Sequence, residues 1–221
     1  DPIEYVFEGK KALIDQREMN DDTHSWPIAL RSALRQDPDV IMVGEIRDRE
    51  TAQMAIRAAI TGHMILGTIH SKDSISAITR LRDLGIEDYL IASALTGIAS
   101  QRLVKNLCPH CKKEYESSQM ETNFINHILN EYQKSYRLFR PIGCPCCIDG
   151  YHKRQGIFEI FELNSKITHQ LAKGAGEIEL IKEIQSMGYK TMLQNAIKLV
   201  AKGEVDFSEV MEKIYDEGIS F

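Results

Sequence analysis

The sequence predicts an α/β protein whose mostly parallel sheet is flanked by helices, followed by a small cysteine-bearing unit and a C-terminal helical region. Two short apolar runs, at 40–43 and 64–69, are typical of buried strands, and a helical pattern follows each of them. All five cysteines lie in one stretch with little periodic apolar pattern. We therefore expect three parts, which are residues 1–107, 108–150 and 151–221.

In the first part, strands alternate with helices. Residues 5–7 and 12–14 have the β-branched and aromatic content of short strands. A helix begins after Ser25 and ends before Pro38, because proline restricts the residue that precedes it. The later elements are a strand at 40–43, a helix at 50–60 capped by Asp48, a strand at 64–69, and helices at 73–84 and 89–100.

The second and third parts differ in pattern. Residues 108–150 predict a loop-rich segment with too little apolar content to fold unaided. Residues 156–162 alternate apolar and polar side chains as a strand does. Helical patterns close the chain at 166–173, 177–187, 191–202 and 208–215.

Composition and charge narrow the class of protein. The chain has 221 residues, of which 43% are hydrophobic and 27% charged, and this excludes disordered and fibrous classes. It lacks an apolar run of roughly 18 residues and the layout of a secretory signal, so we expect a cytosolic protein. The net charge of -5 argues against nucleic acid as the direct partner. The absence of an initiator Met suggests a fragment of a longer protein.

The strand at 40–43 is followed directly by Gly44 and Glu45, which places a carboxylate at a sheet edge, where α/β proteins bind ligands. An acidic residue there is more often a helix cap or a solvated charge. Several arginines and two histidines that bracket the second strand make the functional interpretation stronger. Carboxylates hold Mg²⁺ and position water, while Arg and His stabilise a transferring phosphoryl group, so the segment predicts nucleotide hydrolysis.

Two long motifs carry a family resemblance. Residues 30–48, which include Gly44-Glu45-Ile46-Arg47-Asp48, resemble the Walker B box of the secretion ATPases, and residues 61–70 resemble their His box. Asp1-Pro2-Ile3-Glu4 is similar to the end of the Asp box of that family. The resemblance continues through the cysteine pairs to residues 156–159. It implies a RecA-like P-loop NTPase core and a hexameric motor of type II secretion or type IV pilus assembly.

The resemblance also implies roles for single residues. Glu45 would polarise the attacking water, Glu4 would support the Mg²⁺ site, and His70 would sense the γ-phosphate of ATP. Arg31 and Arg35 would reach nucleotide phosphate within or across the subunit interface. The weaker candidates are Arg17 and Arg47 for the same task, with Gly44, Asp48 and His63 in supporting roles. For each arginine the alternative is a solvated surface group, and for His63 it is a helix cap.

The resemblance further implies where the protein works. It predicts a cytoplasmic homo-oligomer, held at the inner membrane through a platform protein and other components of secretion or pilus assembly. Neither the residues nor the resemblance decides among secretion, pilus assembly, retraction and DNA uptake. The segment 16–19 is closer to the retraction branch, whereas the cysteine unit is typical of the assembly and secretion branches.

One expected motif is missing, because the chain contains no Gly-x-x-x-x-Gly-Lys-Ser/Thr phosphate-binding loop. Gly9-Lys10 is followed by another lysine and has no glycine at the required position before it. We therefore expect the phosphate-binding loop to lie upstream of Asp1, and we predict that the 221-residue chain does not hydrolyse ATP alone.

The cysteines form two C-x-x-C pairs, Cys108 with Cys111 and Cys144 with Cys147. Two such pairs are the usual ligand set of structural Zn²⁺, and Cys146 is the spare thiol by spacing. A disulfide framework is disfavoured without a secretory signal, and a redox dithiol needs only one pair. His110 and His152 remain possible substitute ligands.

Two other functions stay open on the sequence. The cysteine unit could be a zinc ribbon that binds nucleic acid or protein, since it contains five Lys or Arg residues and Lys105 lies just before it, although glutamates dilute that charge. The chain could also be a regulator that does not hydrolyse nucleotide, against which the intact Gly44-Glu45 argues.

Overall fold

The computed structural model describes residues 3–132 and 134–215, so Asp1 and Pro2 of the predicted Asp box lie outside the described residues. The chain divides into two compact units, each built from two separate stretches. Unit 1 comprises residues 1–97 and 162–183, and unit 2 comprises residues 98–161 and 184–221. The three-part division expected from the sequence stays a prediction.

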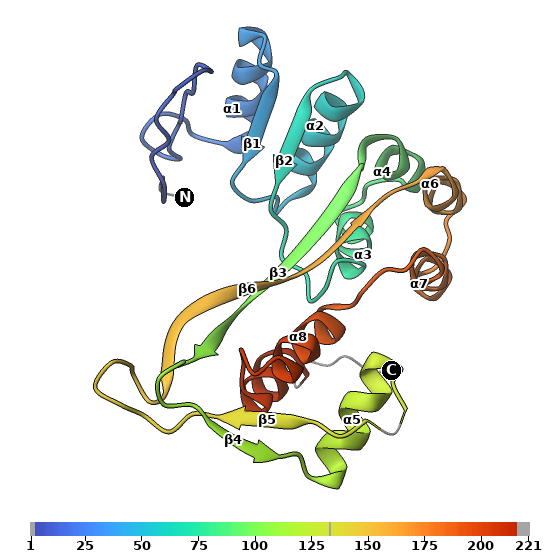
Figure 1. The fold of residues 1–221 in the computed structure, drawn as a ribbon. Coiled ribbons are helices and arrows are strands. Elements are labelled where there is room, and N and C mark those ends of the chain that lie inside the picture. The colour runs from blue at the N-terminus through green and yellow to red at the C-terminus, as the bar shows by residue number, and fades with distance from the viewer. Residues whose placement is uncertain (1–2, 133, 216–221) are drawn as a thin grey trace. The chain divides into compact units, whose positions relative to one another are not determined.

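Unit 1 contains most of the helices, and Figure 1 shows their order along the chain. Its elements are α1 (Trp26–Ala33), the 3₁₀ turn η1 (Leu34–Gln36), β1 (Val40–Val43), α2 (Arg49–Ile60), β2 (Met64–Gly67), α3 (Ser76–Asp83), α4 (Asp88–Ala94) and α6 (Ser165–Ala172). Helix α7 (Glu177–Ser186) begins in unit 1 and ends in unit 2.

Unit 2 is richer in strands. Its elements are β3 (Gly97–Leu107), β4 (Lys113–Glu116), α5 (Gln119–Leu129), β5 (Arg137–Arg140), β6 (Tyr151–Glu162), α8 (Met192–Ala201), α9 (Phe207–Val210) and the π-helical turn η2 (Met211–Tyr215). None of the helices in the described parts of either unit is long and apolar enough to cross a membrane.

The predicted parallel pairing is confirmed for β1 and β2. The two strands pair in register from Val40 opposite Met64 to Val43 opposite Gly67. Ile41 and Val43 point to one face, where they form a small core with Leu30 of α1. Helices α1 and α2 pack against each other beside the strand pair (Figure 1). The α/β character expected from the sequence is therefore present.

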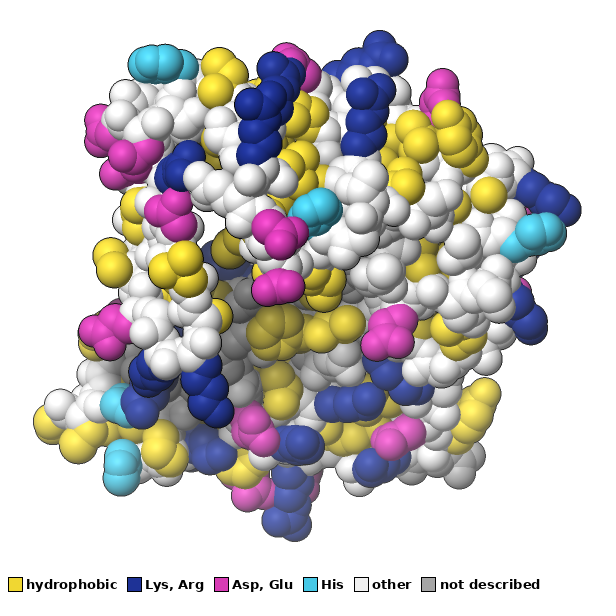
Figure 2. All heavy atoms as spheres, turned by 90° about the horizontal axis from the view of Figure 1, so that it is seen from above, with side chains coloured by type: hydrophobic (Ala, Val, Ile, Leu, Met, Phe, Trp, Pro, Cys, Tyr) yellow, Lys and Arg dark blue, Asp and Glu magenta, His cyan; other side chains and the backbone are white. Residues whose placement is uncertain are grey.

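The other face of this strand pair is exposed, contrary to the prediction of fully buried strands. Val40 and Met42 are 55% and 63% exposed, and their partners Met64 and Leu66 are 54% and 48% exposed. Side chains alternate between the faces of a strand, so helices on one side bury only every second residue. Figure 2 shows further hydrophobic side chains exposed among charged ones on the face that it draws.

The two strands predicted near the N-terminus are absent. Tyr5, Val6 and Leu13 are 77%, 80% and 99% exposed, and residues 5–7 and 12–14 form no ladder. The side chain of Gln16 instead accepts a hydrogen bond from Phe7 N and donates one to Tyr5 O, both at 2.8 Å. The reason is that a two-stranded hairpin without a packing surface is marginal in water.

The helix predicted at 89–100 is shorter than expected, because α4 ends at Ala94 and β3 begins at Gly97. Leu95 already has extended backbone angles. Residues 97–107 pair with β6 to form a two-stranded sheet. Pairing with a distant strand thus overrides the local helical pattern, as tertiary context commonly does.

The segment between the cysteine pairs is not loop-rich, which corrects the sequence-based expectation. Strands β4 and β5 form an antiparallel pair, and α5 starts with a capping box made by Ser118 and Glu121. Ile125 and Leu138 are fully buried in a core that also contains Leu193 and Ile197 of α8. The apolar residues are sparse in sequence but converge on a core that the segment shares with α8.

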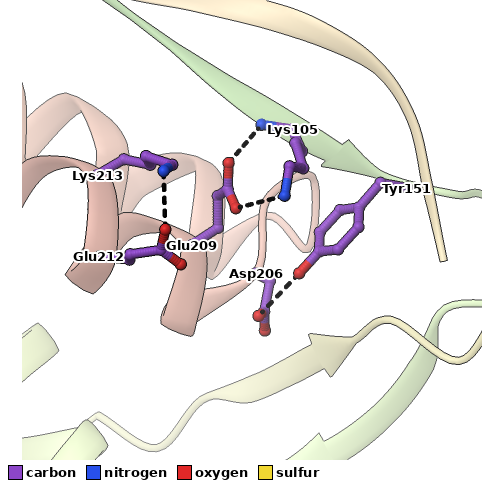
Figure 3. Close-up of polar contacts among 6 residues, drawn as sticks. All are labelled: Lys105, Tyr151, Asp206, Glu209, Glu212 and Lys213. Carbon is purple, nitrogen blue, oxygen red and sulfur yellow. Dashed lines mark hydrogen bonds and ion pairs between the residues drawn. The ribbon is translucent and has the colours of Figure 1, made fainter. Parts of the chain in front are cut away.

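Unit 2 also buries three carboxylates, those of Glu159, Asp206 and Glu209, and Figure 3 shows the last two. Glu209 is 4% exposed and accepts a hydrogen bond of 3.1 Å from the backbone N of Lys105, whose Nζ lies 3.7 Å from the same carboxylate. Asp206 is 5% exposed, and Tyr151 donates a hydrogen bond of 3.5 Å to it. Burial raises the pKa of Asp206, and burial together with these carboxylates raises the pKa of Tyr151 to about 12. The pair connects β3 and β6 with α9.

A glycine after α8 gives a test of this core. Gly203 has φ +70°, and a Cβ there would lie 2.3 Å from the Phe139 ring. We expect Gly203→Ala to lower the free energy of unfolding by about 3 kcal/mol, combining left-handed strain with overpacking. Urea denaturation measures the change. The matched control is Gly188→Ala, which has φ +82° and open space around the Cβ, so it should cost only about 1 kcal/mol. Equal losses in the two variants would show that the Phe139 contact is not limiting.

Candidate functional site

The carboxylate of Glu45 lies just past the end of β1 and is held between two basic side chains. Its side chain is 13% exposed. Arg47 Nη2 lies 2.5 Å from Glu45 Oε2, and His70 Nε2 lies 2.8 Å from Glu45 Oε1. The strand pair explains this meeting, because Glu45 and His70 follow the carboxyl ends of two adjacent parallel strands. The structure therefore brings together three of the predicted site residues.

The charge of Glu45 follows from these neighbours. The hydrogen bond from Arg47 lowers the pKa of the Glu45 carboxyl; burial opposes this, and the charges of Arg47 and His70 lower it further. Oε1 is buried, and His70 Nε2 lies 2.8 Å from it. Glu45 is thus an ionised carboxylate with a basic neighbour at each oxygen. Each carboxylate oxygen has two lone pairs, so the group can accept a further hydrogen bond, as expected of a group that orients a water molecule.

Two residues that the sequence did not single out shape the backbone around Glu45. Thr68 Oγ1 donates a short hydrogen bond to Gly44 O, and Ile46 N donates one of 2.9 Å to Thr68 O. A Cβ at Gly44 would lie 3.2 Å from the Trp26 ring. The sequence predicts Thr68 inside a strand at 64–69, but β2 ends at Gly67. The only feature of the sequence that could have indicated a role for Thr68 is that it lies two residues before His70.

The other candidates on this segment have structural contacts. Asp48 caps α2, accepting hydrogen bonds from Thr51 N at 2.9 Å and Thr51 Oγ1 at 2.8 Å, and the bond from Thr51 N is the main reason its pKa is lowered. His63 Nδ1 lies 3.2 Å from Ala58 O at the end of α2. Asp48 and His63 thus bond to the two ends of α2, as a helix cap does, and their recorded hydrogen bonds do not involve Glu45.

Within residues 3–132 and 134–215, the structure records no hydrogen bond or ion pair between Glu45 and Glu4, Arg17, Arg31 or Arg35. Arg17 pairs with Asp15 at 3.1 Å. Arg31 and Arg35 are exposed and form no ion pair within residues 3–132 and 134–215. Arg35 lies in η1 and not in α1, because the helix tightens before Pro38. Among the described residues, no cluster of three acidic or His ligands surrounds Glu45.

The four cysteines of the two C-x-x-C pairs do converge. Their sulfur atoms all lie within 4.8 Å of one another. The distances between sulfurs are 3.9 Å for Cys108 and Cys144, 3.7 Å for Cys111 and Cys147, and 3.5 Å for Cys144 and Cys147. Tetrahedral Zn²⁺ with bonds of about 2.3 Å would place its sulfurs about 3.8 Å apart. The donor set therefore fits zinc, and the exposed Cys146 is not part of it.

Local backbone bonds hold these thiols in place. Cys108 N donates a hydrogen bond of 2.9 Å to Gly150 O, which joins the end of β3 to the start of β6. Gly150 has φ +84°, and a Cβ there would lie 2.4 Å from Pro141, so only glycine fits. Cys144 N donates to Cys147 Sγ at 3.3 Å, as in a metal-binding knuckle. The four cysteines are thus held next to the ends of strands in unit 2.

Comparison with known proteins identifies the class and then the family. The chain resembles the crystal structure of the pilus retraction motor PilT with bound ADP, at a TM-score of 0.69 and 30% identity, covering 100% of this chain and 51% of that one. The Legionella pneumophila ATPase DotB shares the fold at a TM-score of 0.64 and 19% identity, covering 91% and 45% of the two chains. The fold is that of RecA-like P-loop ATPases.

The family model described as "Type II/IV secretion system protein" matches residues 1–212, and the chain belongs to this family. It is 37% identical over 218 residues to the type II secretion system protein HxcR of Pseudomonas aeruginosa, and 38% identical over 213 residues to the type II secretion system ATPase E of Vibrio cholerae. It is 35% identical over 214 residues to the type IV pilus assembly ATPase PilB of Acinetobacter baylyi. These alignments cover 95–98% of this chain but only 36–41% of the relatives.

Proposed function

We propose that this chain is part of an ATPase motor subunit that powers assembly of a type II secretion pseudopilus or a type IV pilus. The observation that carries the proposal is the ionised, mostly buried side chain of Glu45, which is held between Arg47 and His70 just past the end of β1. Supporting it, relatives 35–38% identical are named as a secretion protein, a secretion ATPase and a pilus assembly ATPase.

In this proposal Glu45 orients the water that attacks the γ-phosphate of ATP and accepts its proton. Arg47 and His70 hold the carboxylate from both sides, so little reorganisation is needed when the substrate arrives. His70 is 85% exposed in its side chain and can therefore also reach a phosphate. The exposed Arg31 and Arg35 remain candidates for phosphate contacts within or across a subunit interface.

The phosphate-binding loop is proposed to lie in a part of the protein that is not in this sequence. The chain contains no Gly-x-x-x-x-Gly-Lys-Ser/Thr and spans about two-fifths of its type II secretion relatives. Loop and Glu45 would together complete the ATP site, and Glu4 would support Mg²⁺ there.

The proposed setting is a cytoplasmic hexamer bound to an inner-membrane platform protein and to assembly components, without direct contact with nucleic acid. Pilus retraction or DNA uptake is the second candidate, favoured by the likeness to the PilT structure. The tetracysteine site supports the assembly and secretion branches, which is why they come first.

The test compares the complete protein, expressed from the whole gene, with the 221-residue chain. We expect the complete protein to release phosphate from ATP with ordinary enzymatic turnover and the isolated chain to give only background. A coupled phosphate-release assay measures both, with nucleotide binding followed separately. An inactive complete protein that still binds ATP would contradict hydrolysis, whereas turnover by the isolated chain would contradict the missing loop.

A further inference from the structure

We propose that Thr68 is a positioning residue for Glu45, setting the place of the carboxylate through two backbone hydrogen bonds. This inference rests on the proposed ATPase function. Thr68 Oγ1 donates to Gly44 O, and Thr68 O accepts from Ile46 N at 2.9 Å. A single residue therefore fixes the backbone on both sides of Glu45.

The need for such a residue comes from where the sheet ends. The ladder between β1 and β2 stops at Val43 opposite Gly67, and the next helix, α2, begins only at Arg49. Glu45 consequently lies in a connecting segment that neither a strand nor a helix holds. The two hydrogen bonds of Thr68 continue the backbone contact between the β1 and β2 segments past the end of the ladder, as far as Ile46.

Side-chain packing also holds the segment between β1 and α2 in place. A Cβ at Gly67 would lie 2.8 Å from Ile46 Cδ1, so the absence of a side chain lets Ile46 pack closely against the end of β2. Ile46 also packs against the small core of Leu30, Ile41 and Val43. The residue after Glu45 is thus anchored by packing, and the residue before it depends on the Thr68 hydroxyl.

Thr68 also governs the second contact of the carboxylate. His70 follows it by two residues and places Nε2 2.8 Å from Glu45 Oε1. A change in how Thr68 attaches would move Glu45 and His70 relative to each other. Since displacements of about 1 Å in a catalytic geometry can cost about 10²-fold in rate, the hydroxyl should affect turnover more than substrate binding.

The experiment uses the complete ATPase with two substitutions that separate the hydroxyl from the side-chain shape. Thr68→Val keeps the β-branched shape and removes the donor, whereas Thr68→Ser keeps the donor. The matched control is Thr61→Val, because Thr61 Oγ1 also donates to a backbone carbonyl, that of Ala58 at 2.9 Å, near the other end of β2. Thermal melts confirm that all variants are folded.

We expect Thr68→Val to lower kcat about 10- to 100-fold with KM within about threefold, while Thr68→Ser and the Thr61 control stay within about threefold of the wild type. A Glu45 less firmly held beside Arg47 should have a higher pKa, so the acidic limb of the pH profile for kcat should move to higher pH in Thr68→Val. This limb would not move if Thr68 had only a structural role.

Each outcome is decisive. A wild-type enzyme without turnover would refute the proposed function, whatever the variants do. An active wild type whose Thr68→Val variant has unchanged kcat and pH profile would overturn the role of Thr68 alone. An equal loss of kcat in Thr68→Ser would also overturn it, because the serine retains the hydroxyl. If Thr68→Val does not fold, Thr68→Ala takes its place with the same expectations.

Discussion

Replacing Glu45 by glutamine in the complete ATPase is expected to lower kcat by about 10²- to 10⁴-fold while ATP still binds. Glutamine keeps the size of the side chain and can still accept a hydrogen bond, but it cannot take the proton of the attacking water. It also loses the ion pair with Arg47 at 2.5 Å. Steady-state phosphate release gives kcat, and fluorescent-nucleotide titration gives the affinity.

The control for this variant is Glu50→Gln, which removes an exposed carboxylate in the first turn of α2. It should leave kcat unchanged. Because Arg47 lowers the pKa of Glu45, the wild-type carboxylate stays ionised to a lower pH than an ordinary glutamate, and activity should persist into mild acid until that lowered pKa is reached. Unaltered turnover in Glu45→Gln would remove Glu45 from the proposed role.

Loss of one zinc ligand is expected to have the largest effect on stability. We expect the purified chain to carry one Zn²⁺ and Cys144→Ser to lose it, lowering the free energy of unfolding of unit 2 by more than about 4 kcal/mol. The reason is that Cys108 directly follows β3 and Gly150 directly precedes β6, and a hydrogen bond joins the two residues beside the cysteines. Loss of a ligand would therefore loosen the junction between these two strands. Elemental analysis measures the zinc content, and chemical denaturation measures stability with and without a chelator.

Cys146→Ser is the matched control, since Cys146 is exposed and lies outside the group of four sulfurs. This variant should retain its zinc and its stability. A wild-type chain that is purified without zinc and does not gain stability when zinc is added would contradict the assignment. So would a Cys146→Ser variant that loses as much stability as Cys144→Ser.

Patterns that act over short distances were predictable from the sequence. Asp48 as the cap of α2, the strand at 40–43 and the helix at 192–201 were confirmed within a residue or two. The spacing of the cysteines predicted the four that converge and left Cys146 aside. In these cases the deciding interactions are local in the chain, so the residues carry their own signal.

Features that depend on distant partners were not predictable in the same way. The strand character of 97–107 depends on pairing with β6, whereas the local pattern predicts a helix up to Ser100. The contribution of Thr68 to the candidate site arises only when β2 lies beside β1. Likewise, the burial of Asp206 and Glu209 in unit 2 follows from tertiary packing of residues whose polarity predicts exposure.

The interleaved order of the two units has a consequence for synthesis on the ribosome. Helix α4 packs against α6, but the chain between them, residues 98–161, belongs to unit 2. While that stretch is being translated, the first segment of unit 1 waits without its helical partner, and it can finish only after residue 183 has emerged. Unit 2 must wait longer still, for α8 and α9. Nascent chains therefore expose incomplete cores while residues 98–183 are being translated, and we expect chaperone binding to matter most during that interval.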